Sequence, residues 1–180
     1  GGGTADDQGN FSTSYKDGWN VDYEGEIRNG PNDVGFDYFF GISASLDMPP
    51  YVFVRNRVPT EKATVEKAFH RKGPAGANFE AIDVLPRLTE EAVSFIDRNA
   101  GADKPFFLYM PLNAPHTPIV PTERWRGKSG INVYADFTMQ VDWTVGQVLD
   151  ALDRHRIADN TLIVFTTDNG CSPAAKIPEL

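Results

Sequence analysis

Residues 161 to 170 read Thr161-Leu162-Ile163-Val164-Phe165-Thr166-Thr167-Asp168-Asn169-Gly170. The apolar part is rich in β-branched and aromatic side chains, which predicts a buried β-strand over 161–166. The run stops at a carboxylate, an amide and a glycine, and Ca²⁺ prefers oxygen donors of this kind. Because open α/β sheets bind ligands at the carboxyl ends of their strands, Asp168 and Asn169 are candidate metal ligands.

A second apolar run, over 105–110, also ends in polar residues. It leads into the segment Asn113-Ala114-Pro115-His116-Thr117-Pro118. The prolines on both sides of His116 restrict the backbone, so the imidazole is held in a defined direction. An imidazole so placed can bind an anionic oxygen or protonate a leaving alcohol, which makes His116 a candidate catalytic residue.

Helical patterns alternate with these two runs. Thr89 can cap a helix that stops at Asn99-Ala100-Gly101. A second helix is indicated by apolar residues at spacings of three and four from Phe137 to Leu152, with Asp136 and Gln140 on its other sides. The order helix, strand, helix, strand with short connections predicts a parallel sheet covered by helices over 84–180.

The chain before this region lacks a comparable pattern. Residues 1–34 are rich in Gly, Asn, Asp and Ser and are expected to form loop, and 36–40 to form a short strand or turn. Residues 55–80 are expected to form a long excursion outside the core sheet. The sequence therefore predicts a single partial domain over 1–180, with loops and excursion over 1–83 and the core over 84–180.

Composition excludes some partners. The formal net charge of -8 argues against binding to nucleic acid or to an anionic membrane surface. No apolar run is long enough to span a membrane, and no signal peptide is visible. The single cysteine, Cys171, cannot form an internal disulfide, so the redox compartment stays open.

The chain resembles the sulfatase family, calcium-dependent enzymes that hydrolyse sulfate esters with a formylglycine made from cysteine or serine. The resemblance rests on the segments around 106–118 and 159–170 described above, and it covers nearly the whole chain in order. Sulfatases are generally longer, so the resemblance implies an internal fragment that is inactive alone. Further matching segments are Gly35-Phe36-Asp37-Tyr38-Phe39-Phe40-Gly41, Ser45-Leu46-Asp47-Met48-Pro49-Pro50-Tyr51 and Val84-Leu85-Pro86-Arg87-Leu88-Thr89.

The resemblance carries specific implications. The fold would be α/β, part of an alkaline-phosphatase-like α/β/α sandwich with a mainly parallel sheet and long loops. Asp168 and Asn169 would be calcium ligands, and His116 would contact the sulfate group. The formylglycine would lie outside this chain, and the substrate would be a small-molecule or sugar sulfate ester. Family members lead us to expect a periplasmic, secreted or lysosomal location, and the oligomeric state stays open.

Three further sets of residues resemble functional motifs of the family but are not assigned those functions. Cys171-Ser172-Pro173-Ala174-Ala175 begins like the family's nucleophile motif but has Ala175 where the motif needs arginine, so Cys171 is interpreted as a small neighbour of the metal loop. The pair Asp6-Asp7 imitates the family's first metal aspartates but lacks the apolar strand before them. Lys176 follows the acidic segment too closely to be the family's sulfate-binding lysine.

Several other interpretations stay open. Asp-Asn-Gly is by itself most often a turn, and an isolated loop histidine is most often solvated. His155, between two arginines at a predicted helix end, is explained by the helix dipole. At the level of function, the alternatives are a phosphate-ester or phosphonate hydrolase of the same superfold, a non-catalytic binding module, or a structural fragment whose metal loop binds nothing.

Overall fold

The structure is a computed structural model that describes residue 19 and residues 21–176. The chain divides into two compact units, Gly1–Ala81 and Ile82–Leu180, which are described separately. The aspartates at 6 and 7 lie outside the described residues. None of the helices within the described ranges combines the length and apolar character needed to cross a bilayer.

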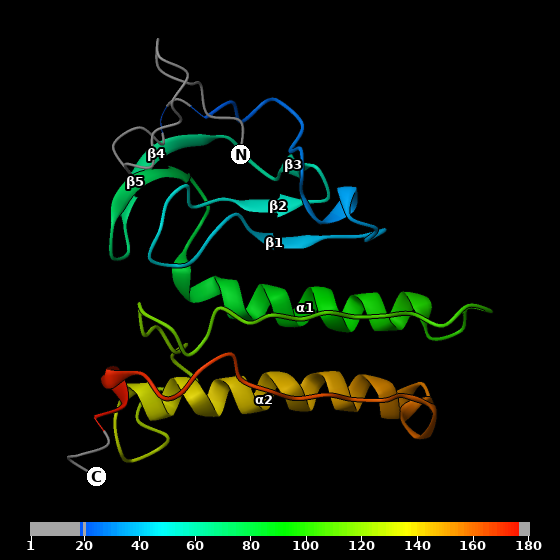
Figure 1. The fold of residues 1–180 in the computed structure, drawn as a ribbon. Helices are drawn as coiled ribbons and strands as arrows, with labels where there is room; N and C mark the ends of the chain where they lie inside the picture. The colour runs from blue at the N-terminus through cyan, green and yellow to red at the C-terminus, as the bar shows by residue number, and fades with distance from the viewer. Residues whose placement is uncertain (1–18, 20, 177–180) are drawn as a thin grey trace. The chain divides into compact units, whose positions relative to one another are not determined.

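The first unit contains two small antiparallel sheets (Figure 1). One has the strand order β1-β2-β3 and the other is the hairpin β4-β5. The sequence analysis predicted an excursion over 55–80 and did not identify this hairpin. The strands are β1 (Phe40–Ile42), β2 (Phe53–Arg55), β3 (Val58–Pro59), β4 (Ala63–Ala68) and β5 (Lys72–Gly76), and a 3-10 helix, η2, spans Pro31–Asp33.

Aromatic side chains form the core of this unit. Phe53 is almost fully buried, and its ring lies 5.4 Å from Phe40 and 4.9 Å from Phe79 between centroids. Tyr51 connects the two sheets, because its N–H donates to the Pro74 carbonyl and its carbonyl accepts from the Gly76 N–H, both at 2.9 Å. The strands of this unit thus pair with strands that are close to them in the sequence.

The second unit is built on two long helices, α1 (Ala81–Asn99) and α2 (Val133–Arg154). The Thr89 and Thr144 hydroxyls lie 3.0 Å apart, and Arg154 contacts Asp97 at 3.2 Å, so the helices lie side by side and run in the same direction (Figure 1). Ile96, Ala151 and Leu152 form the buried cluster between them. Two shorter 3-10 helices follow, η3 (Ala158–Asn160) and η4 (Pro173–Ala175).

Helix α1 ends as predicted but begins eight residues before the predicted cap, Thr89. Thr89 is not a cap: it is buried within the helix, and its hydroxyl donates to the Leu85 carbonyl at 2.8 Å. The sequence prediction started late because threonine is a common N-cap residue, and Thr89 was assigned that role. In the structure Pro86 lies in the second turn, where the missing N–H leaves only the Ile82 carbonyl without its helical partner.

Helix α2 confirms the second predicted helix, but two of its polar residues are more buried than predicted. Asn132 is the N-cap, with its side-chain oxygen accepting the Ala135 N–H at 2.9 Å. Asp136 and Gln140 were expected on the solvated sides of the helix, but both are buried. They are buried because each accepts backbone hydrogen bonds from the loop that precedes the helix.

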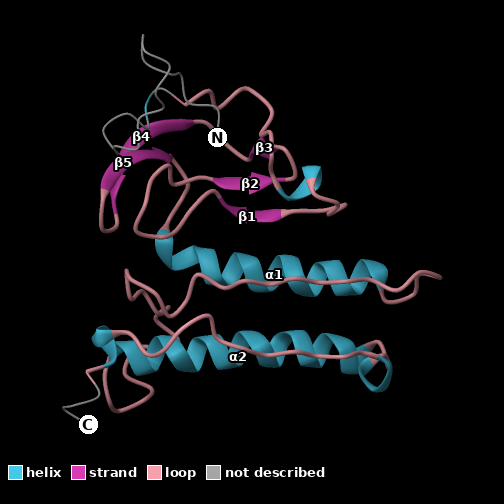
Figure 2. Cartoon of the chain, viewed as in Figure 1, coloured by secondary structure: helices cyan, strands magenta, loops and turns pink. Residues whose placement is uncertain are grey.

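The segments 105–110 and 161–166, predicted as strands, are extended but belong to no sheet (Figure 2). A β-strand is defined by hydrogen bonds to a neighbouring strand, and no described segment pairs with either one. Within the described residues neither segment is therefore a strand. The α/β class is confirmed, with antiparallel sheets in the first unit, whereas a parallel sheet is absent from the described residues.

Candidate active site at the ends of two extended segments

The two extended segments run in the same direction within the second unit (Figure 1). The first begins near the end of α1, where Phe106 packs edge-on against Phe95 with ring centroids 5.5 Å apart. The second begins beside the end of α2, where the Ile157 N–H donates to the Leu152 carbonyl at 3.0 Å. Both segments then run back toward the beginning of α2. We call the polar residues that follow each segment, 113–118 and 168–170, its polar tip.

The two segments differ in how they pack. In the first, Phe106 and Leu108 pack against the cluster between the helices, while Phe107 and Tyr109 alternate outward and are 75% and 66% exposed. In the second, the side chains from Leu162 to Phe165 are all exposed, with Leu162 90% and Val164 78% accessible. The predicted burial of 161–166 is thus corrected, because no described element covers this segment.

His116 lies in a tight turn, in line with the prediction of a constrained backbone. Its N–H donates to the Asn113 carbonyl at 3.3 Å, and its Nδ1 lies 2.7 Å from the Thr117 carbonyl oxygen. Because a carbonyl only accepts, Nδ1 carries the proton in this contact, and Nε2 is the second functional atom of this exposed side chain. The geometry leaves Nε2 available to accept or to transfer a proton.

Asn113, at the start of the same turn, was not singled out from the sequence. Its side-chain nitrogen and oxygen are both shielded from solvent and have no hydrogen-bond partner among the described residues. A buried amide without partners is unfavourable by about 1–3 kcal/mol for each unsatisfied group. Groups of this kind concentrate at sites that another molecule, water or further polypeptide completes.

Asp168 and Asn169 lie in a bend over 168–170, at the tip of the second segment. The bend is held by the Thr167 hydroxyl, which donates to the Asn169 carbonyl at 3.0 Å. Both side chains are exposed and offer one carboxylate and one amide oxygen. These are suitable donors for Ca²⁺, which takes six to eight oxygen ligands.

The described residues alone do not assemble a complete metal site. No group of three or more His, Cys, Asp or Glu side chains within the described ranges is arranged to hold a metal ion. No hydrogen bond or ion pair between described residues joins His116 to Asp168. The described residues therefore show no contact that joins the candidate residues, and Asp168 and Asn169 supply the kind of oxygen donors that form part of a calcium site.

A network at the beginning of α2 supports this end of the unit. The Asp136 carboxylate accepts the Gly127 and Ser129 N–H groups, both at 2.8 Å, and Gln140 Oε1 accepts the Thr122 N–H at 2.9 Å. The hydrogen bonds from Ser129 are the largest cause that lowers the pKa of Asp136, which keeps its carboxylate charged. These contacts tie the loop after His116 to the helix.

The loop after Asp168 is anchored to the same helix. The Asn132 side-chain nitrogen donates to the Ala175 carbonyl at 3.1 Å. Cys171 is exposed, and its sulfur lies 3.9 Å from the Tyr134 hydroxyl. Burial first, and then the contact with Cys171, raises the pKa of Tyr134. This anchoring could not be predicted from sequence patterns, because its partners lie 37 and 43 residues apart.

The remaining histidine of this unit has a structural role, as the sequence suggested. His155 is the C-cap of α2, and its Nε2 lies 2.7 Å from Asp97 Oδ1. This hydrogen bond, followed by one from Arg154, lowers the pKa of Asp97. His155 therefore links the ends of α1 and α2 and lies away from the polar tips.

Comparisons with known proteins agree with the sequence pattern. The family model described as Sulfatase matches residues 7–177. An N-acetylgalactosamine-6-O-sulfatase of Bacteroides thetaiotaomicron is 32% identical, over 83% of this chain and 37% of that protein. The human steryl-sulfatase is 44% identical over 49% of this chain and 15% of its own length.

A solved structure from a study of glycosaminoglycan metabolism by Bacteroides thetaiotaomicron has a similar fold. It superposes with a TM-score of 0.66 at 28% identity, covering 78% of this chain and 37% of that one. The chain thus spans little more than a third of the length of these Bacteroides relatives. The resemblance seen in the sequence is confirmed at the level of family.

Proposed function

Because the chain belongs to the sulfatase family, we propose that the longer protein containing it hydrolyses sulfate esters. The observation that carries this proposal is the family match over nearly the whole chain. The proposal is supported by two extended segments that run in the same direction, since His116 follows the first in the sequence and Asp168 and Asn169 follow the second. In this proposal the polar tips form part of the catalytic centre.

Each side chain has a distinct role in the proposed reaction. Asp168 and Asn169 would hold Ca²⁺ through their side-chain oxygens, and the metal when bound would offset negative charge at the sulfate group. His116, with its Nδ1–H held by the Thr117 carbonyl, would face the ester oxygen with Nε2 and, in its imidazolium form, donate the Nε2 proton to the leaving alcohol and become the neutral imidazole. The formylglycine nucleophile and the other metal ligands would come from elsewhere in the longer protein.

We also propose that segments 105–110 and 161–166 are strands of a mainly parallel sheet completed by other parts of that protein. They run in one direction, they follow helices that run the opposite way, and their outward side chains are apolar. Strands buried on both faces have this composition. The pairing would place an apolar partner against Phe107 and Tyr109 and complete an α/β/α sandwich.

A sugar sulfate is the substrate class we propose. The relative with 32% identity is named for N-acetylgalactosamine-6-O-sulfate chemistry, and the similar solved structure comes from work on glycosaminoglycans. A carbohydrate ester therefore fits the relatives better than a steroid or simple aryl ester. The steryl-sulfatase match covers only half of this chain and carries less weight for substrate.

The test is a matched panel of sulfate and phosphate esters of the same alcohols, assayed on the longer protein with calcium and with a chelator. We expect preference for sulfate and loss of activity on chelation. Asp168→Ala should raise the calcium concentration required, whereas Asp159→Ala, an exposed acid in η3, should not. Preference for the phosphate esters would overturn the proposal in favour of a phosphate-ester or phosphonate hydrolase.

A further inference from the structure

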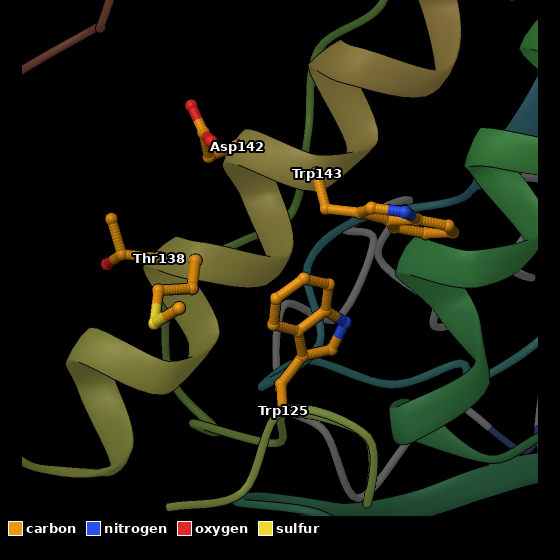
Figure 3. A pocket seen from close by; sticks show the side chains of 5 residues that line it. Trp125, Thr138, Asp142 and Trp143 are labelled. Atoms are coloured by element: carbon orange, nitrogen blue, oxygen red, sulfur yellow. The ribbon is translucent and has the colours of Figure 1, made fainter. Parts of the chain in front are cut away.

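A pocket lies on α2, formed together with the loop that precedes the helix (Figure 3). Its volume is about 490 Å³, within the range typical of sites for small ligands. Four of its residues lie at helical spacings of three and four on α2, and one comes from the loop. The lining residues are Trp125, Thr138, Met139, Asp142 and Trp143.

Two indole rings form the main apolar surface of the pocket. The Trp125 and Trp143 ring centroids lie 6.1 Å apart with their planes inclined at 49°. Figure 3 shows the two rings side by side, with Thr138 and Asp142 projecting from the neighbouring face of α2. Met139 is 38% exposed and adds a flexible apolar side chain to the pocket lining.

Arg124 adds a positive charge beside the rings. Its guanidinium carbon lies 5.1 Å from the Trp125 ring centroid and 4.9 Å from that of Trp143. A guanidinium that stacks through its face keeps its N–H donors in the ring plane, where they remain able to bind an anion. Arg124 makes no hydrogen bond or ion pair with another described residue, so these donors are available.

Asp142 supplies the opposite charge at the pocket wall. Its side chain is exposed, and its carboxylate has no hydrogen-bond or ion-pair partner among the described residues. An ionised carboxylate only accepts hydrogen bonds, and hydroxyl groups are suitable donors to it. The pocket therefore combines apolar ring faces, one acceptor side chain and one neighbouring donor side chain.

This combination selects one class of ligand. A cationic ligand is disfavoured because the positive charge of Arg124 lies beside both indoles and would repel it. A wholly apolar ligand would desolvate Arg124 and Asp142 without pairing them. A pyranose ring offers an apolar C–H face for the indoles and hydroxyls for Asp142, and a sulfate substituent on it matches the guanidinium.

We propose that this pocket is an accessory binding site for a sulfated hexopyranose. The choice of a sulfated sugar rests on the proposed function, whereas the choice of a sugar rests on the pocket itself. The indoles would stack against the ring, Asp142 would accept from its hydroxyls, and Arg124 would bind its sulfate. The site would hold one unit of a sulfated glycan while another unit is hydrolysed.

The experiment is a calorimetric titration of the longer protein with N-acetylgalactosamine 6-sulfate and with unsulfated N-acetylgalactosamine. Arg124→Leu should weaken binding of the sulfated sugar about tenfold and leave the unsulfated sugar unchanged, since it removes a charge-assisted contact. Asp142→Ala should weaken both about tenfold because both share the hydroxyls. Glu123→Ala, an exposed neighbour that pairs with Arg126, is the matched control and should change neither.

A second measurement separates this site from the candidate catalytic centre. Hydrolysis of a small aryl sulfate should keep its kcat/KM within about twofold in all three variants, because none contacts the reacting atoms. Titration curves of Arg124→Leu and Asp142→Ala that match the parent protein for both sugars would overturn the proposal. Weakened sugar binding in a protein that hydrolyses no sulfate ester would reject the proposed function and leave the pocket assignment standing.

Discussion

Similar apolar residues occur in the two small sheets of residues 40–76 and in the two extended segments of the second unit. They differ in burial. In the first region Phe53 is almost fully buried and pairs across β1 and β2 with residues close in sequence. In the second, Phe107 and Val164 lie in extended backbone that pairs with nothing described, and both are largely exposed. Burial of an apolar residue therefore depends on whether its strand partner is near in sequence.

The difference follows from how strands pair. Antiparallel neighbours can be joined by a short turn, as β4 and β5 are, whereas parallel neighbours need a long crossover. A short chain segment can complete the first arrangement by itself. The second arrangement requires strands brought together from distant parts of a polypeptide, which is the completion proposed for 105–110 and 161–166.

The sharpest test of this contrast concerns the chemistry at the segment ends. In the longer protein, His116→Ala should lower kcat for sulfate-ester hydrolysis about 10²- to 10⁴-fold, because a positioned acid is lost. The measurement is steady-state kinetics with a sugar sulfate. His70→Ala, an exposed histidine between β4 and β5 in the first region, should leave kcat unchanged. Equal rates for both variants would remove His116 from the reaction.

A second prediction concerns the self-contained region. Phe53→Ala should lower the free energy of unfolding by about 3–5 kcal/mol, because it removes a buried ring packed against two others. Val58→Ala, an exposed position in β3, should change it by less than about 0.5 kcal/mol. Chemical denaturation followed by circular dichroism measures both, and a small effect of Phe53→Ala would show that the sheet is not an independent core.

The third prediction compares one substitution in two proteins. In the 180-residue chain, Phe107→Ala should change stability by less than about 0.5 kcal/mol, because the side chain is 75% exposed. In the longer protein the same change should be destabilising by up to about 3 kcal/mol, because a neighbouring strand would cover the ring. Denaturation curves of both proteins decide this, with Phe106→Ala as the variant expected to destabilise each. An equally small effect of Phe107→Ala in both would reject the parallel sheet.

Sequence patterns predicted the helices better than the strands, for the same physical reason. The helix over 137–152 was evident because its hydrogen bonds and its apolar spacing are both local. The runs at 105–110 and 161–166 carry strand composition, but a strand exists only when a partner lies beside it. The β4-β5 hairpin was not predicted, because β5 contains Gly73 and Pro74, which are more typical of turns than of strands.

The candidate site likewise combines residues that could be predicted from the sequence with contacts that could not. His116, Asp168 and Asn169 were identified by residue type and position at the ends of apolar runs, and their roles remain predictions. The supporting contacts could not be predicted, because Asp136 and Gln140 read as surface residues on a helical pattern. Only the folded loop, which turns its N–H groups toward them, reveals that they are buried acceptors.

The smallest predicted effect tests that supporting network through pH. The pKa of Asp136 is lowered in the folded chain, so its stabilising contribution is present above the unfolded pKa near about 4 and disappears as pH falls through the folded value. Asp136→Asn should lower the melting temperature at neutral pH, because an amide nitrogen would face the Gly127 or Ser129 N–H. It should also flatten the decrease in stability below about pH 5. Asp150→Asn, an exposed acid on the same helix, is the control, and parallel pH profiles for the two variants would mean that the network does not hold the loop.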